Sequence, residues 1–497
     1  MKKMNLLVMS LVSAAALSFT SCSSNDDLDG NAGQEKVDGF YMTLTVQSPN
    51  ASGTRTSVLD PTENATAGEA AITKGTLYLV DDKNEIAFHE DLSKLDWSGD
   101  VKDDASKKKD GSRTYEIKVP AVEAGKTYRV YFLAGSNKPA PEMNFAATNK
   151  NIFTAADNVA NKFASPFADD NNFAMFNQND AQVNGNGYSV KFSKANNNKQ
   201  NPAKVNYTKD GTSTTTNAPI KVERVVARID APIPGTSTVL AEAPADASAA
   251  LKVAMKDAKE KVAEIKLLNY AVSNLANKSY VMQTWNSSAL VIPDGISYFQ
   301  PTADFGGTYD YKNGGFNTTE ATKVNYVFEN NSTTDPTTMY FEYQITLKDK
   351  EMTNADFKDG DYKGTFYRYN NVIYTSFEQI FKDYEGVSTL FNGKDEGTMK
   401  TELAEAIKDE ATLAKFRQDY NIEVFKGGKT YYKHVIKDNH INGIIQRNSI
   451  YRLNINNIFN VGAQVPNGIP TENEYYYLNV TVTVNPWVLN EDNVNLQ

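Results

Sequence analysis

The sequence predicts a mainly β protein that consists of two strand-built domains, with helical insertions in the second. Its 497 residues are too many for a single hydrophobic core, which indicates two domains. Several segments alternate apolar and polar residues with a period of two, as half-buried strands do. The 27 tyrosines and 24 phenylalanines also suit strands better than helices.

The first 38 residues have the layout of an exported lipoprotein. Lys2 and Lys3 precede an apolar run, and small residues then lead to Cys22, the only cysteine. This pattern predicts a signal peptide over residues 1–21 and lipidation of Cys22 after its removal. Residues 22–38 are acidic and polar, which predicts a flexible tether.

The first predicted strand, within residues 39–48, has one face to bury. Its apolar side chains, Phe40, Met42, Leu44 and Val46, alternate with a second set that is mostly polar. One face of the strand should therefore pack into the hydrophobic core of the first domain. We place this domain at residues 39–215.

A loop is expected over residues 49–70, because small and polar residues follow the strand without periodicity. Arg55 lies in this loop, whereas most of the other eight arginines, such as Arg129 and Arg224, lie in predicted strands. A protease can draw an exposed loop into an extended conformation. We therefore expect cleavage between Arg55 and Thr56.

The rest of the first domain is expected to contain three more strands and long loops. The strands cover residues 75–80, 114–119 and 127–133, and the last two are separated by an Ala-Gly-Lys turn. Residues 136–218 are rich in Asn, Lys, Asp, Thr and Gly, which predicts loops.

The second domain is placed at residues 216–485, with helices inserted between strands. A strand buried on both faces is expected at 220–229, and further strands at 265–272, 449–455 and 477–485. Amphipathic helices are expected at 247–264 and 398–417. Ser376 and Gln379 have the spacing of a capping box and predict the start of a short helix.

A C-terminal segment, residues 486–497, is expected to leave the last strand, because Pro486 and Trp487 should interrupt it. Apolar residues continue beyond this point and should find a surface that covers them. We interpret them as a strand donated to another molecule, carried by Trp487, Val488, Leu489, Val494 and Leu496.

Catalysis and metal binding are poorly supported by the sequence. The three histidines, His89, His434 and His440, have no metal-ligand spacing. Acidic and amide side chains at 169–172, and Asp359 with Asp361, resemble parts of a calcium loop that lacks its bidentate Glu. A glycosidase needs only two carboxylates, so the sequence is silent on that class. We expect no enzyme, no cofactor and no metal; the net charge of −10 argues against nucleic acid as a partner.

Cleavage after Arg55 would separate the first strand from the body of the protein. A sheet that loses a strand exposes unpaired backbone groups and an apolar groove, which accept a replacement strand. The C-terminal segment of a second copy could fill the groove. Because this contact is heterologous it does not close on itself, and it produces a filament.

The order of several motifs resembles that of the Bacteroidales-type fimbrillins, a family of protease-assembled pilus subunits. The motifs are the lipoprotein signal ending at Cys22, the Tyr-Met-Thr-Leu-Thr-Val strand before an arginine loop, and three later runs. Those runs are Val-Glu-Arg-Val-Val-Ala-Arg at 222–228, Arg-Asn-Ser-Ile-Tyr-Arg-Leu-Asn-Ile at 447–455, and the ending Val-Thr-Val-Asn-Pro-Trp. The chain is most similar to the minor-fimbrillin branch, the stalk subunits of short fimbriae.

This resemblance implies two transthyretin-like β-sandwich domains and an outer membrane lipoprotein precursor that ends in a cell-surface fimbria. It implies lipidation at Cys22, an arginine-specific surface protease that cuts after Arg55, and a donor segment from Trp487 onward. The expected partners are other copies, related fimbrial subunits and the lipoprotein export machinery, with a host or bacterial receptor that is unknown. The alternative is a surface lipoprotein that binds glycans, with the many tyrosines and Trp97 or Trp285 as stacking platforms.

Overall fold

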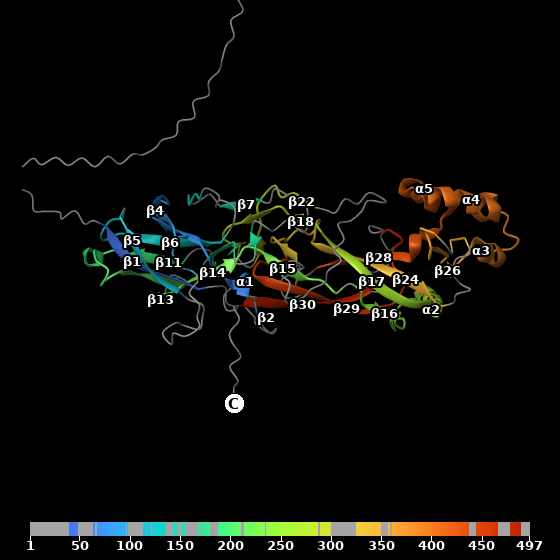
Figure 1. The fold of residues 1–497 in the computed structure, drawn as a ribbon, viewed down its shortest axis with the longest axis horizontal. Helices are drawn as coiled ribbons and strands as arrows, with labels where there is room; N and C mark the ends of the chain where they lie inside the picture. Colours follow the sequence, from blue (N-terminus) through green and yellow to red (C-terminus); the bar gives the residue numbers. More distant parts are fainter. Residues whose placement is uncertain are drawn as a thin grey trace, which may run out of the picture. The chain divides into compact units, whose positions relative to one another are not determined.

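The computed structural model describes most of the chain from Gly39 to Val488, and it is mainly β. The described residues are 39–47, 63–64, 67–95, 97, 113–120, 122–135, 143–146, 151–154, 167–169, 172–178, 187–209, 213–233, 235–286, 289–299, 325–348, 356–357, 360–436, 444–465 and 478–488. Figure 1 shows that most of the labelled elements are strands. The predicted fold class, strand-rich with helices toward the C-terminus, is confirmed.

The first sheet contains ten strands, and the pairings among six of them connect in a ring, although two of these strands share one edge of the first strand. The ring exists because β10 pairs with β14 on one side and with β6 on the other. Its members in order are β10 (Met175–Asn177), β14 (Ile220–Arg224), β1 (Phe40–Gln47), β12 (Ala203–Lys209), β11 (Tyr188–Lys191) and β6 (Thr127–Ala134). Outside the ring are β3 (Gly75–Val80), β4 (Ile86–Asp91), β5 (Arg113–Val119) and β13 (Ser213–Thr216).

Two further sheets are built mainly from residues after 226, and β2 from the first part of the chain joins one of them. One has the order β2 (Glu63–Asn64), β30 (Leu478–Val488), β29 (Ser449–Ile458), β15 (Ala227–Asp230) and β23 (Asn325–Val327). The other has the order β16 (Ser237–Thr238), β17 (Val262–Ser273), β24 (Thr338–Leu347) and β28 (Lys429–Val435). Inward residues of both, such as Leu267, Phe341 and Leu453, are at most 3% exposed, as expected for facing sheets in a β-sandwich.

Small ladders complete the strand list. They are β25 (Phe366–Tyr369) with β26 (Val372–Tyr374) and β27 (Glu423–Phe425), β7 (Ile152–Thr154) with β19 (Lys278–Tyr280), β18 (Leu275–Ala276) with β22 (Tyr298–Phe299), β20 (Thr284–Asn286) with β21 (Ala289–Val291), and β8 (Ala168–Asp169) with β9 (Asn172–Phe173). The 3₁₀ turns are η1 (Lys194–Asn196), η4 (Leu390–Gly393) and η5 (Lys426–Gly428).

The predicted strand over 220–229 is wrong, because the chain forms two strands there. β14 belongs to the first sheet and β15 to the sheet of β29, and Val225 and Val226 lie between them with no exposed surface. The continuous apolar run reflects a crossing from one sheet to the next. The loops predicted over 136–218 are also partly wrong, since β10, β11, β12 and β13 lie in this range.

The helices largely follow their predicted caps and stripes. α2 (Ala249–Lys261) begins at Ser248, whose side chain accepts from the Leu251 N–H. α3 (Phe377–Asp383) begins at Ser376, as predicted, and the Gln379 side chain accepts from the Thr375 N–H. α1 (Ala67–Ala70) is a single turn inside the segment that was expected to be a loop.

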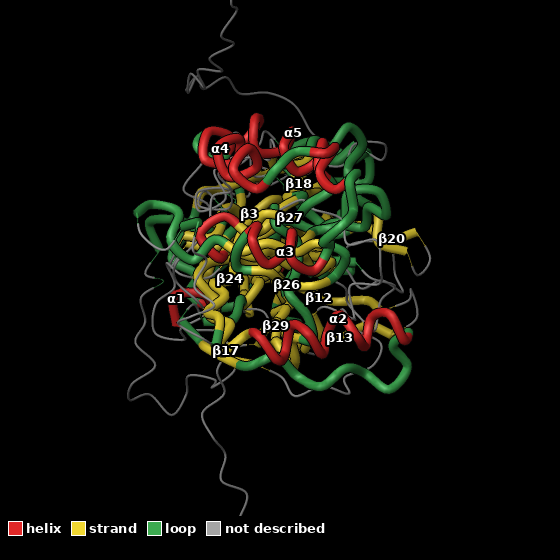
Figure 2. Tube along the Cα trace, turned by 90° about the vertical axis from the view of Figure 1, so that its right-hand side faces the viewer, coloured by secondary structure: helices red, strands yellow, loops and turns green. Residues whose placement is uncertain are grey.

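The helix predicted over 398–417 is two helices. α4 (Glu396–Ala406) ends at Ile407, and α5 (Glu410–Tyr420) starts anew because the Asp409 side chain accepts from the Thr412 N–H. Figure 2 shows α4 and α5 close together, in agreement with their packing. With α3 and the β25–β27 ladder they share one hydrophobic core, so this insertion has a core of its own; its members include Tyr367, Phe377, Leu403, Leu413 and Phe416.

Candidate functional site

The candidate site is built around β1, whose predicted inner face is buried. Phe40 is 5% exposed, Met42 and Leu44 have no exposed surface, and Val46 is 1% exposed. The alternating residues Tyr41, Thr43 and Thr45 are half-buried. The period of two therefore places one complete face of this strand in the core of the first sheet.

Both edges of β1 are hydrogen-bonded to other strands. On one edge β5 runs antiparallel, in register from Phe40 with Val119 to Val46 with Arg113. On the other edge β12 pairs in parallel with Met42 and Thr43, and β14 pairs in parallel with Val46 and Gln47. The strand is thus internal, and its loss would leave backbone groups of three strands without this partner.

Two predicted modification sites, Cys22 and the Arg55–Thr56 bond, lie outside the described residues. The loop predicted over 49–70 does not extend to its expected end. β2 and α1 occupy residues 63–64 and 67–70, and Glu69 is only 1% exposed. The composition of this segment is loop-like, but the side chain of Glu69 is held by the distant Arg228 and its backbone oxygen by Arg224.

The predicted break at Pro486 and Trp487 is wrong. β30 continues to Val488, and Pro486 pairs with Ser449 of β29. Trp487 and Val488 pair in parallel with Glu63 and Asn64 of β2. Proline has no N–H to donate, so a strand tolerates it where the edge on that side needs no hydrogen bond from it. The other donor residues, Leu489, Val494 and Leu496, lie outside the described residues.

A buried ionic cluster around Glu69 was not predicted. The Glu69 carboxylate accepts from Arg228 Nη1 at 3.0 and 3.2 Å, and Arg228 also donates to Asp230 at 2.8 and 3.2 Å. Arg452 donates to the same Asp230 at 3.1 Å. Burial raises the pKa of Asp230 to about 6 although both arginines oppose this shift.

The cluster also holds Arg224 of β14, which has no exposed surface. Arg224 donates through Nε to the Glu69 backbone oxygen at 2.8 Å and through Nη1 to Asn448 Oδ1 at 2.9 Å. Burial lowers the pKa of Arg224 to about 9, and the nearby charge of Glu69 limits this fall. The signal available in the sequence was charged residues inside the apolar run at 222–228.

A second buried cluster includes Glu223, the residue of β14 directly before Arg224. Arg447 contacts Glu329 at 2.9 Å and approaches Glu223 only to 4.0 Å. Among the described residues, neither carboxylate oxygen of Glu223 has a hydrogen-bond partner. Burial, together with the charge of Glu329, raises the pKa of Glu223 to about 8, and Arg447 only partly opposes the shift.

Two of the three histidines lie among the described residues. His89 is exposed and stacks on Tyr78, His434 is half-buried, and His440 lies outside the described residues. Within the part of the chain that the structure describes, no three His, Cys, Asp or Glu side chains come together as metal ligands would. In the same ranges, no helix is both long and apolar enough to cross a bilayer.

The glycan-stacking alternative is contradicted at its two tryptophan platforms. Trp97 is 3% exposed and donates to the Leu92 carbonyl at 2.8 Å. Trp285 is 5% exposed and donates to Gln283 at 3.0 Å. Both rings are core residues, so neither offers a face on which a sugar could stack.

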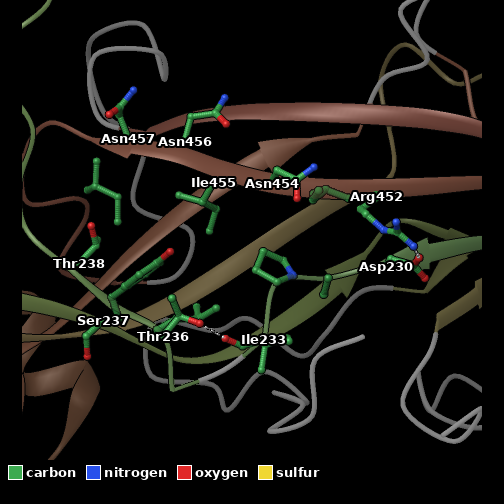
Figure 3. A pocket seen from close by; sticks show the side chains of 16 residues that line it. Asp230, Ile233, Thr236, Ser237, Thr238, Arg452, Asn454, Ile455, Asn456 and Asn457 are labelled. Atoms are coloured by element: carbon green, nitrogen blue, oxygen red, sulfur yellow. Dashed lines mark hydrogen bonds and ion pairs between the residues drawn. The ribbon is translucent and has the colours of Figure 1, made fainter. Parts of the chain in front are cut away.

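A cavity of about 460 Å³ lies between β29 and the segment that carries β16. Figure 3 shows Asn454 and Ile455 on the β29 side, and Thr236 and Ser237 on the other side. Asp230, which forms an ion pair with Arg452, lies at one end. The lining mixes amides, hydroxyls and aliphatic groups, and it contains none of the site residues predicted from the sequence.

Comparison with known proteins gives one family match and several structural likenesses. Residues 423–493, which include β27–β30, match the model described as "Major fimbrial subunit protein type IV, Fimbrillin, C-terminal". No curated protein matches the chain.

Three solved structures are reported among the likenesses. A candidate cell adhesion protein from Parabacteroides distasonis is 16% identical, with 91% of this chain and 98% of that chain covered, at a TM-score of 0.46. A fimbrial assembly protein from the same species is 13% identical, with 63% and 99% covered and a TM-score of 0.24. A candidate adhesin from Bacteroides ovatus is 9% identical, with 61% and 74% covered and a TM-score of 0.22.

The family match covers the last four strands of the described chain, β27 to β30. These are the strands from which the predicted donor segment continues. The C-terminal region of the chain, residues 423–493, is therefore similar to the C-terminal region of the fimbrillins.

Proposed function

We propose that this protein is a structural subunit of a bacterial surface fimbria that assembles by donor-strand exchange. It is exported as a lipoprotein through Cys22, cleaved between Arg55 and Thr56 by an arginine-specific surface protease, and thereby deprived of β1. Residues 489–497 of a second copy then take the place of β1. The product is a filament of identical or related subunits, with this chain in the stalk.

The observation that carries the proposal is the internal position of β1. Four apolar side chains are at most 5% exposed, and β5, β12 and β14 all pair with the strand. A peripheral strand could leave without consequence, whereas this one would leave a hydrophobic slot with unpaired N–H and C=O groups on both sides. Such a slot favours a replacement strand over water.

Substitution of Arg55 by Ala is expected to abolish both cleavage and filament formation by an arginine-specific protease, because β1 then stays covalently attached. The measurement is a denaturing gel followed by electron microscopy of the treated protein. Arg55→Lys is the matched control: it should resist the arginine-specific protease and be cut by trypsin, with filaments only in the second case. High-mass ladders from Arg55→Ala equal to those of the wild type would contradict the proposal.

Deletion of residues 489–497 is expected to leave folded, cleaved monomers that do not elongate. β30 stays intact in this variant, since it ends at Val488. Size-exclusion chromatography after cleavage measures the result. A mixture with intact chains should give short filaments, because the deleted chain still accepts a strand but donates none. Normal filaments from the deleted chain alone would place the donor elsewhere.

A further inference from the structure

We propose that Glu69 is the positioning residue of a clasp, formed by β2 and α1, that stays docked after the Arg55 cut. The clasp fixes the end of β30 from which residues 489–497 continue. Its role in assembly rests on the proposed function, but the clasp itself is a property of the single folded chain and can be tested without any filament.

Glu69 is held at four points by residues of three strands. Its carboxylate accepts from Arg228 of β15 at 3.0 and 3.2 Å and from the Tyr326 hydroxyl of β23 at 2.8 Å. Its backbone oxygen accepts from Arg224 of β14 at 2.8 Å. A residue 1% exposed with these contacts is an anchor point, although it lies only 14 residues after Arg55.

The same arginines connect Glu69 to the beginning of β29. Arg224 also donates to Asn448, the residue directly before β29. Arg228 shares Asp230 with Arg452 of β29. The cluster thus binds the segment after the cleavage loop and the beginning of β29 into one polar network, in which charge-assisted hydrogen bonds dominate.

β2 joins this network to the end of β30. The beginning of β29 is paired with the end of β30, as Ser449 with Pro486. β2 lies on the other side of the same end, paired with Trp487 and Val488. The last described residues of the chain are therefore held between β29 and β2, and α1 follows β2 after two residues.

Removal of the Glu69 carboxylate would increase the excess of positive charge in the cluster. Arg224, Arg228 and Arg452 face two carboxylates, Glu69 and Asp230. Without the Glu69 carboxylate, Arg228, which is 2% exposed, loses a charged acceptor where water cannot replace it. Arg224 loses the compensating charge of Glu69 but keeps its hydrogen bond to the backbone oxygen. The segment 63–70 would then be the weakest-held part of the site, and β2 would detach from β30.

The clasp matters for assembly because cleavage removes β1 and leaves residues 63–70 in place. A donor segment that leaves from a fixed strand end has fewer orientations to lose when it enters a neighbour. A donor segment that continues from a frayed strand end has more orientations to lose, so its binding is less favourable. Glu69 would therefore act on the rate at which filaments grow, and not on the protease step.

Hydrogen exchange read by mass spectrometry tests the clasp on the intact chain. Glu69→Gln is expected to speed exchange at least about tenfold in peptides covering 63–70 and 486–488, because charge-assisted bonds are lost. Peptides covering 449–455 should stay protected, since their pairing with β30 persists. After cleavage, Glu69→Gln chains should be cut at the normal rate but elongate several-fold more slowly.

Two further variants keep the test decisive. Tyr326→Phe removes only the hydroxyl contact to Glu69, keeps the ring beside Phe173, and should give a smaller increase at the same peptides even if Glu69→Gln fails to fold. Glu123→Gln, which breaks an exposed ion pair with Lys126, is the matched control and should change nothing. Unchanged exchange at 63–70 and 486–488 in both Glu69 and Tyr326 variants overturns the clasp. If exchange changes as expected but wild-type chains never assemble, the proposed function fails and the clasp stands.

Discussion

Replacement of Leu44 by Asp is expected to lower the free energy of unfolding of the intact chain by about 3–5 kcal/mol. Leu44 has no exposed surface and lies at the middle of β1, where it is in register with Tyr115 of β5. The change removes a buried aliphatic side chain and places a carboxylate where the strand faces the core. Urea unfolding followed by tryptophan fluorescence measures this loss of stability. Trp97 reports on the region because its ring centroid lies 4.5 Å from that of the same Tyr115.

The Leu44→Asp variant also tests whether β1 is absent from the assembled subunit or remains in it. If β1 is discarded on assembly, Leu44→Asp filaments should be as resistant to urea as wild-type filaments, although the precursor is weakened. Thr45→Asp, one residue further on the half-buried face, is the matched control and should change precursor stability by less than about 1 kcal/mol. Filaments of Leu44→Asp that dissociate at lower urea than wild-type filaments would show that β1 remains in the assembled subunit.

The position of β1 could be predicted because its information is local. Eight consecutive residues alternate, and one face of them is buried as expected. The N-terminus of α3 is likewise local, since Ser376 caps a helix that starts one residue later. Period and caps are properties of a few neighbouring residues, so they can be recognised without knowing what the element packs against.

The strand partners of β1 could not be predicted, because pairing is non-local. β12 is 160 residues from β1 at its first hydrogen-bonded contact, where Thr43 donates to the Ala203 carbonyl. Its sequence, Ala-Lys-Val-Asn-Tyr-Thr-Lys, alternates, but it stands in an asparagine-rich region whose composition indicates loops. Composition was therefore the wrong guide there, and the period of two was the better one.

The apolar run at 222–229 shows that the sequence could not indicate which sheet a buried strand joins. Continuous burial predicts a strand but contains no sign of which sheet it enters, and here the chain changes sheets at Val225 and Val226. Arg224 and Arg228 are the visible exception within the run, since arginine is rarely buried without partners. Their partner Glu69 is 155 residues away from Arg224, in a segment of loop-like composition. Sequence can thus indicate that such partners exist, but not which residues they are.

Glu223 gives the second large expected effect, an inverted dependence of stability on pH. Its side chain is buried, without a hydrogen-bond partner among the described residues, and burial raises its pKa from 4.5 to about 8. The groups that face it are Arg447, which lowers this pKa, and Glu329, which raises it. The folded state therefore binds the proton more tightly than the unfolded state, and the resulting stabilisation is complete below pH 4.5.

This stabilisation is lost as the pH rises from about 4.5 toward 8, by roughly 1 kcal/mol per pH unit in the middle of the window. Most carboxylates act in the opposite direction, so we expect the wild type to lose stability between pH 6 and 8 relative to Glu223→Gln, which carries no ionisable group at this position. Urea unfolding of both proteins at several pH values measures the difference, with Glu123→Gln, at an exposed glutamate, as the control. The difference in free energy of unfolding between wild type and Glu223→Gln could instead stay constant from pH 5 to pH 8. That result would contradict the prediction, because it would show that Glu223 is ionised in the folded protein and that Arg447 balances the charges of both Glu223 and Glu329.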